Sequence, residues 1–278
     1  MGTSSLYKGP RTSVLLPPDY EDNSSGQDKT IQDNPPIEVT PNEGAAEENS
    51  SNGTLDASPS VTWGSAKSTM TKSYSGGSRQ IRNAVKQYTK ALGGHKNAAR
   101  QAVSAKKVTS HVITFFSGSV ADIKSHLEDA GIRFESRATS DIFLEIRDVL
   151  APSPDTLEDS YANKAVNDTI AEIISEKDFD LTTIDDVLNA DILERMVCGF
   201  IKNYIYEKLM GQDTLGVIKH ETDPNKIKKF EKILMDCIDG FVMFSVPPIL
   251  KDGMGRKELN VLVNELYETC YKTMEEMK

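Results

Sequence analysis

The fold class is decided by residues 192–210, which read ILERMVCGFIKNYIYEKLM. Apolar side chains recur there every three or four positions, at Ile192, Met196, Phe200, Ile201, Tyr204, Ile205 and Leu209. This spacing collects them on one wide face of a helix, and such a face is stable only when other elements bury it. Gly211 follows directly and predicts the end of the helix.

The same helical spacing recurs on both sides of this segment. Convincing strand alternation is absent from the sequence, apart from a few ambiguous residues near Phe134, so the pattern favours helices throughout the folded part. We predict further helices over residues 79–92, 96–116, 140–150, 224–244 and 257–277, and a helical turn over 184–188.

Local start and stop signals divide these helices. Ser119 and Asp122 form a capping box, which opens a helix that ends at Gly131. Ser153-Pro154 places a cap before a first-turn proline and predicts the start of another helix. Pro247-Pro248 is expected to break the helix that precedes it, because proline cannot donate the backbone hydrogen bond.

Residues 19–61 have a different composition and are predicted to be a disordered acidic linker. Ser, Asn, Asp, Glu, Gly and Pro dominate, with only isolated apolar residues, which are too few to offset the entropy of ordering the chain. A flexible chain of about 42 residues spans roughly 35 Å. We therefore predict an all-α protein, an orthogonal helical bundle preceded by a long disordered N-terminal tail.

Charge is strongly segregated along the chain. Residues 1–60 hold 3 basic and 10 acidic residues, residues 61–121 hold 10 basic and no acidic ones, and residues 122–278 hold 19 basic and 32 acidic ones. We therefore divide the folded part into a basic, glycine-punctuated helical region over 62–131 and an acidic helical domain over 132–278.

The basic region carries a candidate contact surface. Its cations are Arg79, Arg82, Lys86 and Lys90, which fall at spacings of 3, 4 and 4 and so line one helix stripe, with Arg100 extending the same field. Three interpretations stay open: the stripe binds nucleic acid, it pairs with an acidic surface in this molecule or a partner, or it is a solvated face.

Signals for catalysis are missing from the sequence. Neither of the phosphate-binding patterns GxxxxGK[ST] and GxGxxG occurs, and the histidines and the three cysteines show no metal-ligand spacing. Uninterrupted apolar runs stay well short of the roughly 20 residues that span a bilayer, and the first 30 residues lack a secretory signal. We expect a cytoplasmic, non-enzymatic protein without metal, cofactor or membrane association.

The first 18 residues are more specific than the linker that follows them. They read MGTSSLYKGPRTSVLLPP, and their partner-binding candidates are Gly2, Thr3, Ser4, Tyr7, Gly9, Pro10, Leu15, Leu16, Pro17 and Pro18. Small Gly2 favours removal of Met1, which exposes an α-amine with a pKa near 8. Leu6 stands where myristoylation needs Ser or Thr. The functional options for the segment are a peptide that inserts into a partner's groove, or one that is modified at Gly2, whereas composition alone favours a start without a specific role.

A family resemblance favours the two functional options for this segment. The start MGTSSLYKGP with the later LLPP resembles the QatB family, a component of the bacterial Qat anti-phage defence system. Further similar stretches include Trp63-Gly64, Ser75-Gly76-Gly77, Gly93-Gly94 and Tyr204-Ile205-Tyr206-Glu207.

The resemblance implies a four-gene system with an ATPase (QatA), a QueC-like enzyme of deazaguanine chemistry (QatC) and a TatD-like DNase (QatD). It assigns no catalytic activity to this component. QueC-like enzymes activate the carboxylate of a 7-deazaguanine with ATP, so the resemblance implies Gly2 as the amine that receives this group. QatC is then the main partner, with QatA and QatD as further ones.

The leading functional prediction is a non-catalytic adaptor whose residues 1–18 bind, and are modified at Gly2 by, the QueC-like enzyme. The alternative is a nucleic-acid-binding subunit that recruits the TatD-like DNase through the basic helices.

Overall fold

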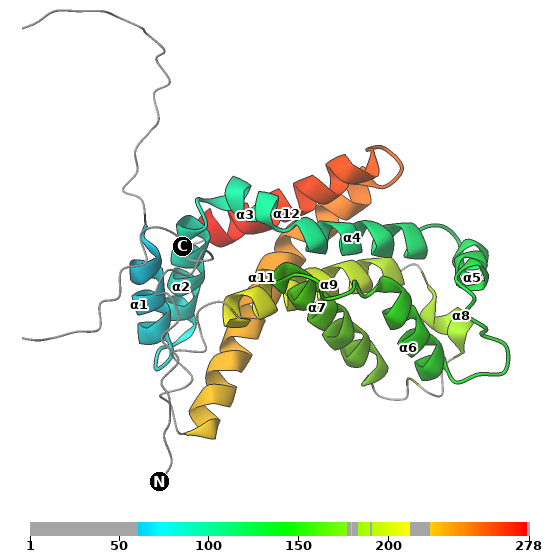
Figure 1. Cartoon of the computed structure of the whole chain (residues 1–278), viewed down its shortest axis with the longest axis horizontal. Coiled ribbons are helices and arrows are strands. Elements are labelled where there is room, and N and C mark those ends of the chain that lie inside the picture. Colours follow the sequence, from blue (N-terminus) through cyan, green and yellow to red (C-terminus); the bar gives the residue numbers. More distant parts are fainter. Residues whose placement is uncertain (1–60, 177–178, 180–182, 190, 212–222, 277–278) are drawn as a thin grey trace, which may run out of the picture. The chain divides into compact units, whose positions relative to one another are not determined.

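The computed structural model describes residues 61–176, 179, 183–189, 191–211 and 223–276, and every regular element among them is a helix (Figure 1). The chain divides into two units, Met1–Thr54 and Leu55–Lys278, and the described residues belong to the second. The all-α prediction is confirmed. The predicted disordered tail lies outside the described residues, apart from the last residue of the 19–61 linker.

The helices follow one another with short connections. In chain order they are α1 (Trp63–Ser73), α2 (Ser78–Ala91), α3 (His95–Gln101), α4 (Val103–Phe116), α5 (Val120–Asp129), α6 (Thr139–Leu150), α7 (Leu157–Ile174), α8 (Ile184–Val187), α9 (Ile192–Leu209), α11 (Pro224–Gly253) and α12 (Leu259–Glu276).

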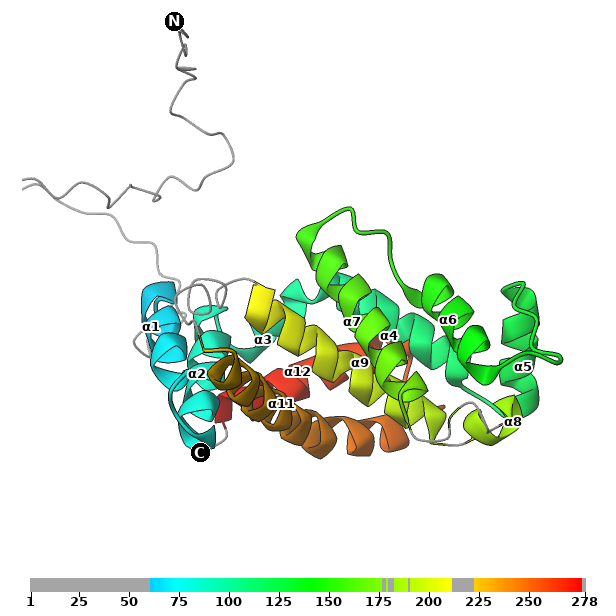
Figure 2. The same cartoon turned by 90° about the horizontal axis from the view of Figure 1, so that it is seen from below.

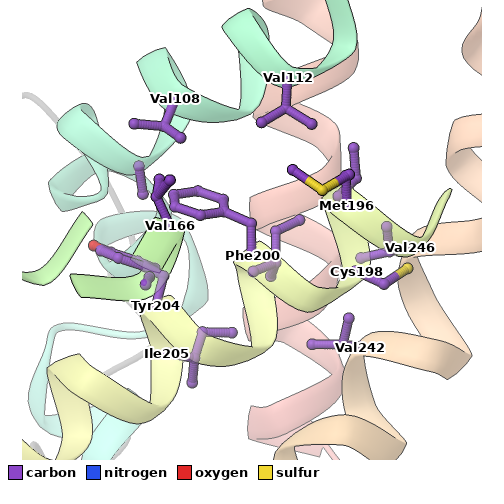
Figure 3. Packing of buried hydrophobic residues seen from close by; sticks show 14 of the residues in the cluster. Val108, Val112, Val166, Met196, Cys198, Phe200, Tyr204, Ile205, Val242 and Val246 are labelled. Carbon is purple, nitrogen blue, oxygen red and sulfur yellow. The ribbon is translucent and has the colours of Figure 1, made fainter. Parts of the chain in front are cut away.

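Helix α9, the segment from which the fold class was predicted, lies at the centre of the body. It packs against α7, α4 and α11. Figure 3 shows Phe200 and Met196 pointing toward Val108 and Val112 of α4, while α11 approaches the other side of α9. The apolar positions predicted to be buried are buried, with Phe200 only 1% exposed. Burying side chains of this size contributes roughly 1.5–3 kcal/mol each, so α9 anchors its neighbours.

Helix α12, the last helix of the described chain, packs against helices near its beginning. It packs against α11, α4, α3 and α2, and α2 stands steeply to α4 and α12 in both views (Figures 1 and 2). This arrangement is the predicted orthogonal bundle. Its clearest polar contact joins α3 to the end of α12, where the backbone N–H of His95 donates to Glu275 Oε2 over 3.0 Å.

The basic region and the acidic region share one hydrophobic core. A single cluster of buried residues runs from Met70 in α1 to Met274 in α12. The change of charge near residue 131 is therefore not matched by a gap in the packing of the described residues.

Helix α1 was not predicted, because its sequence is mostly polar. Thr62 caps it by accepting from the backbone N–H of Ser65, and Ala66 and Met70 are its buried apolar residues. It packs antiparallel to α2, with the rings of Trp63 and Tyr88 meeting edge to face at 5.7 Å. Contact with α2, rather than local propensity, stabilises this helix.

Two helix boundaries differ from the prediction. The helix expected over 96–116 is two helices that meet at Ala102, whose φ of −79° and ψ of 49° interrupt the helical hydrogen bonds. Buried Ala102 fits there because its methyl group needs little room. The cap predicted at Ser153 is three residues farther on, since Thr156 and Asp159 form the capping box of α7. The capping box at Ser119 is confirmed.

The predicted break at Pro247-Pro248 is wrong, because α11 continues through both prolines to Gly253. Each proline deprives one carbonyl group, those of Met243 and Phe244, of its helical donor. These two residues are 49% and 72% exposed, so water can solvate the carbonyl groups. Buried Pro247 also contributes to the interior of the body.

By length and composition α11 also qualifies as a membrane span, with a mean hydropathy of 1.7 over its most apolar 18-residue window, of which 39% is buried. Asp236 and Asp239 interrupt its apolar residues, so no long uninterrupted apolar run marks this helix in the sequence. Its packing against α2, α9 and α12 is that of a core helix in a folded body.

Candidate functional site

The N-terminal candidates lie outside the described residues. This holds for Gly2 and for the nine other positions predicted to bind a partner, Thr3, Ser4, Tyr7, Gly9, Pro10, Leu15, Leu16, Pro17 and Pro18. The structure therefore describes only the second set of candidates, the basic residues Arg79, Arg82, Lys86, Lys90 and Arg100.

Three of those five basic residues come together in one groove. Arg79, Arg82 and Lys86 of α2 and Lys72 of α1 line a concavity of about 730 Å³ between the two helices, which we call the α1–α2 groove. Its other lining residues are neutral and polar: Thr69, Ser73, Gln80 and Asn83. The lining therefore contains four cations and no carboxylate.

The groove follows from the local sequence of the hairpin. Gly76 and Gly77 connect the helices, and the side chain of Gln80 closes the start of α2 by accepting from the N–H of Gly77 over 2.8 Å. Ile81 and Val85 on the opposite side of α2 are fully buried, which turns the arginines outward. Neither α1 nor α2 has an acidic residue in its first turn.

The four cations of the groove have no ion-pair partner among the described residues. No carboxylate oxygen of those residues lies within 4.0 Å of the charged nitrogens of Lys72, Arg79, Arg82 or Lys86, whereas the acidic part of the body forms many pairs, such as Lys208 with Glu158 at 3.2 Å. Arg82 and Asp236 both line a neighbouring concavity, where they do not form an ion pair. The intramolecular pairing that the sequence left open is thus not formed at these positions.

Lys90 and Arg100 lie elsewhere. Arg100 lines a second concavity of about 430 Å³ with Lys96, Lys106 and Glu268, between α3, α4 and α12. There Lys106 Nζ donates to Asn264 Oδ1 over 3.0 Å, and partial burial lowers the pKa of this lysine. The five predicted residues therefore do not form one continuous surface.

Glu275 lies near Lys90 and contacts His95 directly. His95 Nδ1 is 2.8 Å from Glu275 Oε2. Partial burial opposes ionisation of the carboxyl group, but the hydrogen bonds from His95 and the charge of Lys90 outweigh it and keep the pKa of Glu275 below its ordinary value. This contact ties α3 to α12.

A buried polar network between α7 and α9 was missed by sequence reasoning. Lys208 Nζ lies 3.2 Å from Glu158 Oε2 and 3.1 Å from the hydroxyl oxygen of Tyr204, which also donates to Glu158. The side chain of Lys208 is only 3% exposed, and burial lowers its pKa although Glu158 works in the opposite direction. Its position four residues after Tyr204, on the apolar face of α9, was the available signal.

The network positions helices rather than reacting groups. Its charges are mutually neutralised, and its residues line none of the three concavities described above. Burial raises the pKa of Tyr204 well above its ordinary value, so its hydroxyl group stays protonated and donates to Glu158. A hydrogen-bonded charge pair of this kind fixes how α7 meets α9.

The three cysteine thiols are not activated as nucleophiles. Burial raises the pKa of Cys198 and Cys270 to about 12 and that of Cys237 to about 11, so their thiols are weak nucleophiles at neutral pH. Within the described ranges no group of three His, Cys, Asp or Glu side chains is placed to hold a metal ion.

Comparison with known proteins gives one match. No curated protein and no solved structure matches the chain. The family model of QatB, the Qat anti-phage system associated protein, matches residues 93–274, which is more than half of the chain and extends from the end of α2 nearly to the end of α12. The α1–α2 groove precedes the matched stretch. With most of its helical body covered by this match, the chain belongs to the QatB family of Qat anti-phage defence proteins.

Proposed function

We propose that this chain is a non-catalytic adaptor of the Qat system, which presents its N-terminal residues 1–18 to the QueC-like component, QatC. The supporting observation is the division of the chain into two units. The helical body with the family match belongs to the unit Leu55–Lys278, and the N-terminal segment belongs to the unit Met1–Thr54. A peptide that a partner enzyme handles is expected outside the body that holds the hydrophobic core.

The chemistry of the body agrees with a non-catalytic role. The raised pKa values of Cys198, Cys237 and Cys270 leave no activated thiol among the described residues, and the lining of the α1–α2 groove contains cations and neutral polar groups without a carboxylate to act as a base.

The proposed modification is formation of an amide at Gly2. After removal of Met1, the neutral α-amine attacks the carboxyl carbon of a 7-deazaguanine that the QueC-like enzyme has activated with ATP. The carbon–nitrogen bond forms, the activating group leaves with its electron pair, and the amine loses one proton to solvent. An α-amine has a pKa near 8, so a usable fraction is neutral at cellular pH.

Intact-mass measurement tests this modification. The chain is expressed with and without QatC, and the expected result is a mass increase equal to the nucleobase acyl group only with QatC, mapped to the N-terminal peptide. Gly2→Ala keeps Met1 removal and a primary amine and should still be modified. Gly2→Glu retains Met1, so it exposes no amine at position 2 and should not be modified there. An identical, unmodified N-terminus in both expressions would contradict the proposal.

Binding of the N-terminal segment is tested separately, by recovery of QatC on the immobilised full chain and on a variant lacking residues 1–18. Recovery should fall at least tenfold with the deletion. Replacement of Tyr7 and Leu15 by Ala should reproduce part of this loss, because aromatic and aliphatic anchors dominate the affinity of bound peptides. Undiminished recovery would contradict binding through this segment.

A second candidate function is recruitment of the TatD-like DNase, QatD, to nucleic acid. The unpaired cations of the α1–α2 groove favour it. The test is recovery of QatD on immobilised DNA, which should require this chain. DNase recovery that is equal with and without the chain would exclude recruitment, whatever the chain itself binds.

A further inference from the structure

The α1–α2 groove has the composition of a site for a polyanion. It has two guanidinium groups, two ammonium groups and the amides of Gln80 and Asn83, and its volume is about 730 Å³. Arg79, Arg82 and Lys72 are exposed to solvent, and Lys86 is partly buried against the hairpin. Guanidinium groups bind phosphate through two parallel hydrogen bonds, and ammonium groups bind it as point charges.

Electrostatic cost explains why such a groove needs an anion. Four like charges on one short hairpin repel one another, and the described residues supply no carboxylate within 4.0 Å to relieve this. Residues 122–278 are net acidic, so the rest of the body repels a polyanion and directs it toward the hairpin.

The stripe on α2 suits a polymer that is charged at every residue. Arg79 and Lys86 are seven residues apart, which is about 10 Å along the helix, and Arg82 lies between them within about 60° of arc. A nucleic acid strand carries a phosphate on every nucleotide, so any stretch that lies along α2 presents charge to all three cations. An extended peptide directs only alternate side chains to one face, so it does the same only where its sequence has acidic residues at those alternate positions.

We infer that the α1–α2 groove binds the phosphodiester backbone of nucleic acid. Arg79, Arg82 and Lys86 contact successive phosphates of one strand from α2, and Lys72 contacts the same strand from α1. Phosphate contacts fix position without reading bases, so the site is independent of sequence. The site deepens the second candidate function but requires neither DNase recruitment nor modification of Gly2.

Salt dependence measures the number of phosphate contacts. The purified full chain is titrated against a fluorescent single-stranded DNA of mixed sequence between 20 and 200 mM salt. Four contacts predict a slope of log affinity against log salt of about −3, and removal of one cation by Arg79→Gln should reduce its magnitude by about 0.7.

Charge reversal locates the site. R79E/R82E/K86E should weaken binding at least 30-fold at low salt. The matched control R133E/K251E/R256E makes the same change in net charge on exposed residues near the ends of α5 and α11, at the opposite end of the described body from α1 and α2 (Figure 1), and should change affinity less than threefold. Circular dichroism and urea unfolding verify that both variants are folded.

Three results would overturn the inference: no binding by the full chain at 20 mM salt, equal losses in the two triple variants, or competition by poly-glutamate as effective as that by DNA at equal charge. The last would identify the groove as a surface for acidic protein. None of these results bears on the mass of the N-terminus, so failure here is distinct from failure of the adaptor proposal.

Discussion

Two buried tyrosines on α12 differ in whether their hydroxyl groups have a partner. The hydroxyl groups of Tyr267 and Thr109 lie 2.9 Å apart and share a hydrogen bond, whereas the buried hydroxyl group of Tyr271 has no partner among the described residues. Both side chains are at most 1% exposed. Folding removes water from both hydroxyl groups but supplies a new hydrogen-bond partner only to that of Tyr267. The hydroxyl group of Tyr267 therefore stabilises the folded state, whereas that of Tyr271 destabilises it.

The first prediction follows from this difference. Tyr271→Phe removes an unsatisfied polar atom without changing the shape of the core and should raise the free energy of unfolding by about 1 kcal/mol. Tyr267→Phe leaves the buried Thr109 hydroxyl group unpaired and should lower it by about 1–2 kcal/mol. Urea unfolding at pH 7 measures both, and changes of the same sign and size would show that the Tyr271 hydroxyl group has found a partner.

Single residues also mark the limit of sequence-based prediction of the candidate site. Arg79, Arg82 and Lys86 were predicted to share a stripe, and the structure has them in one groove. Lys72 was not included, because its helix is too polar to be predicted. Arg100 was grouped with the same field because sequence shows the density of charge but not the direction that the chain takes at Gly93 and Gly94, which separate α2 from α3.

At the scale of elements, prediction succeeded where one strong local signal agreed with packing. The apolar face of α9 and the capping box at Ser119 are such cases. It failed where tertiary packing overrides propensity, as in α11, which contains two prolines, and at Ala102, a good helix former that nevertheless separates α3 from α4.

The second prediction concerns the start of α7. Thr156 Oγ1 accepts from the N–H of Asp159 over 3.1 Å, and Asp159 Oδ2 accepts from the N–H of Thr156 over 3.0 Å. Thr156→Ala should therefore lower the free energy of unfolding by about 1 kcal/mol. Ser153, the cap suggested by the sequence, is exposed and outside the helix, so Ser153→Ala should change it by less than about 0.5 kcal/mol. Thermal unfolding ranks the two variants, and the reverse order would place the cap at Ser153.

At the scale of the whole molecule, charge and core are arranged differently. One hydrophobic core includes helices from the basic and the acidic parts of the sequence. On the surface the charges stay separate: among the described residues, the cations of the α1–α2 groove have no ion-pair partner, whereas ion pairs form over the acidic part. The family match covers the shared core from residue 93 onward. A body so divided can fold as one unit and still present an anion-binding surface on one side only.

Stability of this shared core should decrease in alkali, and the buried thiols are the first cause. Burial raises the pKa of Cys198 and Cys270 from 9.0 to about 12, and that of Cys237 to about 11. Their contribution to stability is complete below pH 9, where both states are protonated. It is lost as pH rises from 9 toward 11 or 12, because the unfolded chain releases these protons first.

The third prediction is that the free energy of unfolding falls when the pH is raised from 8 to 10. Each of the buried thiols of Cys198 and Cys270 accounts for about 1.4 kcal/mol of this fall, and half-buried Cys237 for less, so the three together account for about 3 kcal/mol. Lys208 acts in the opposite direction, since its lowered pKa makes the unfolded state bind more protons in the range below 10.5.

A variant with all three cysteines replaced by Ala keeps Lys208 and the buried tyrosines. Urea unfolding under reducing conditions should therefore show the unchanged chain losing about 3 kcal/mol more than this variant between the two pH values. Equal losses would mean that the thiols reach water in the folded protein, and that the contacts among α2, α9, α11 and α12 that enclose them open at high pH without global unfolding.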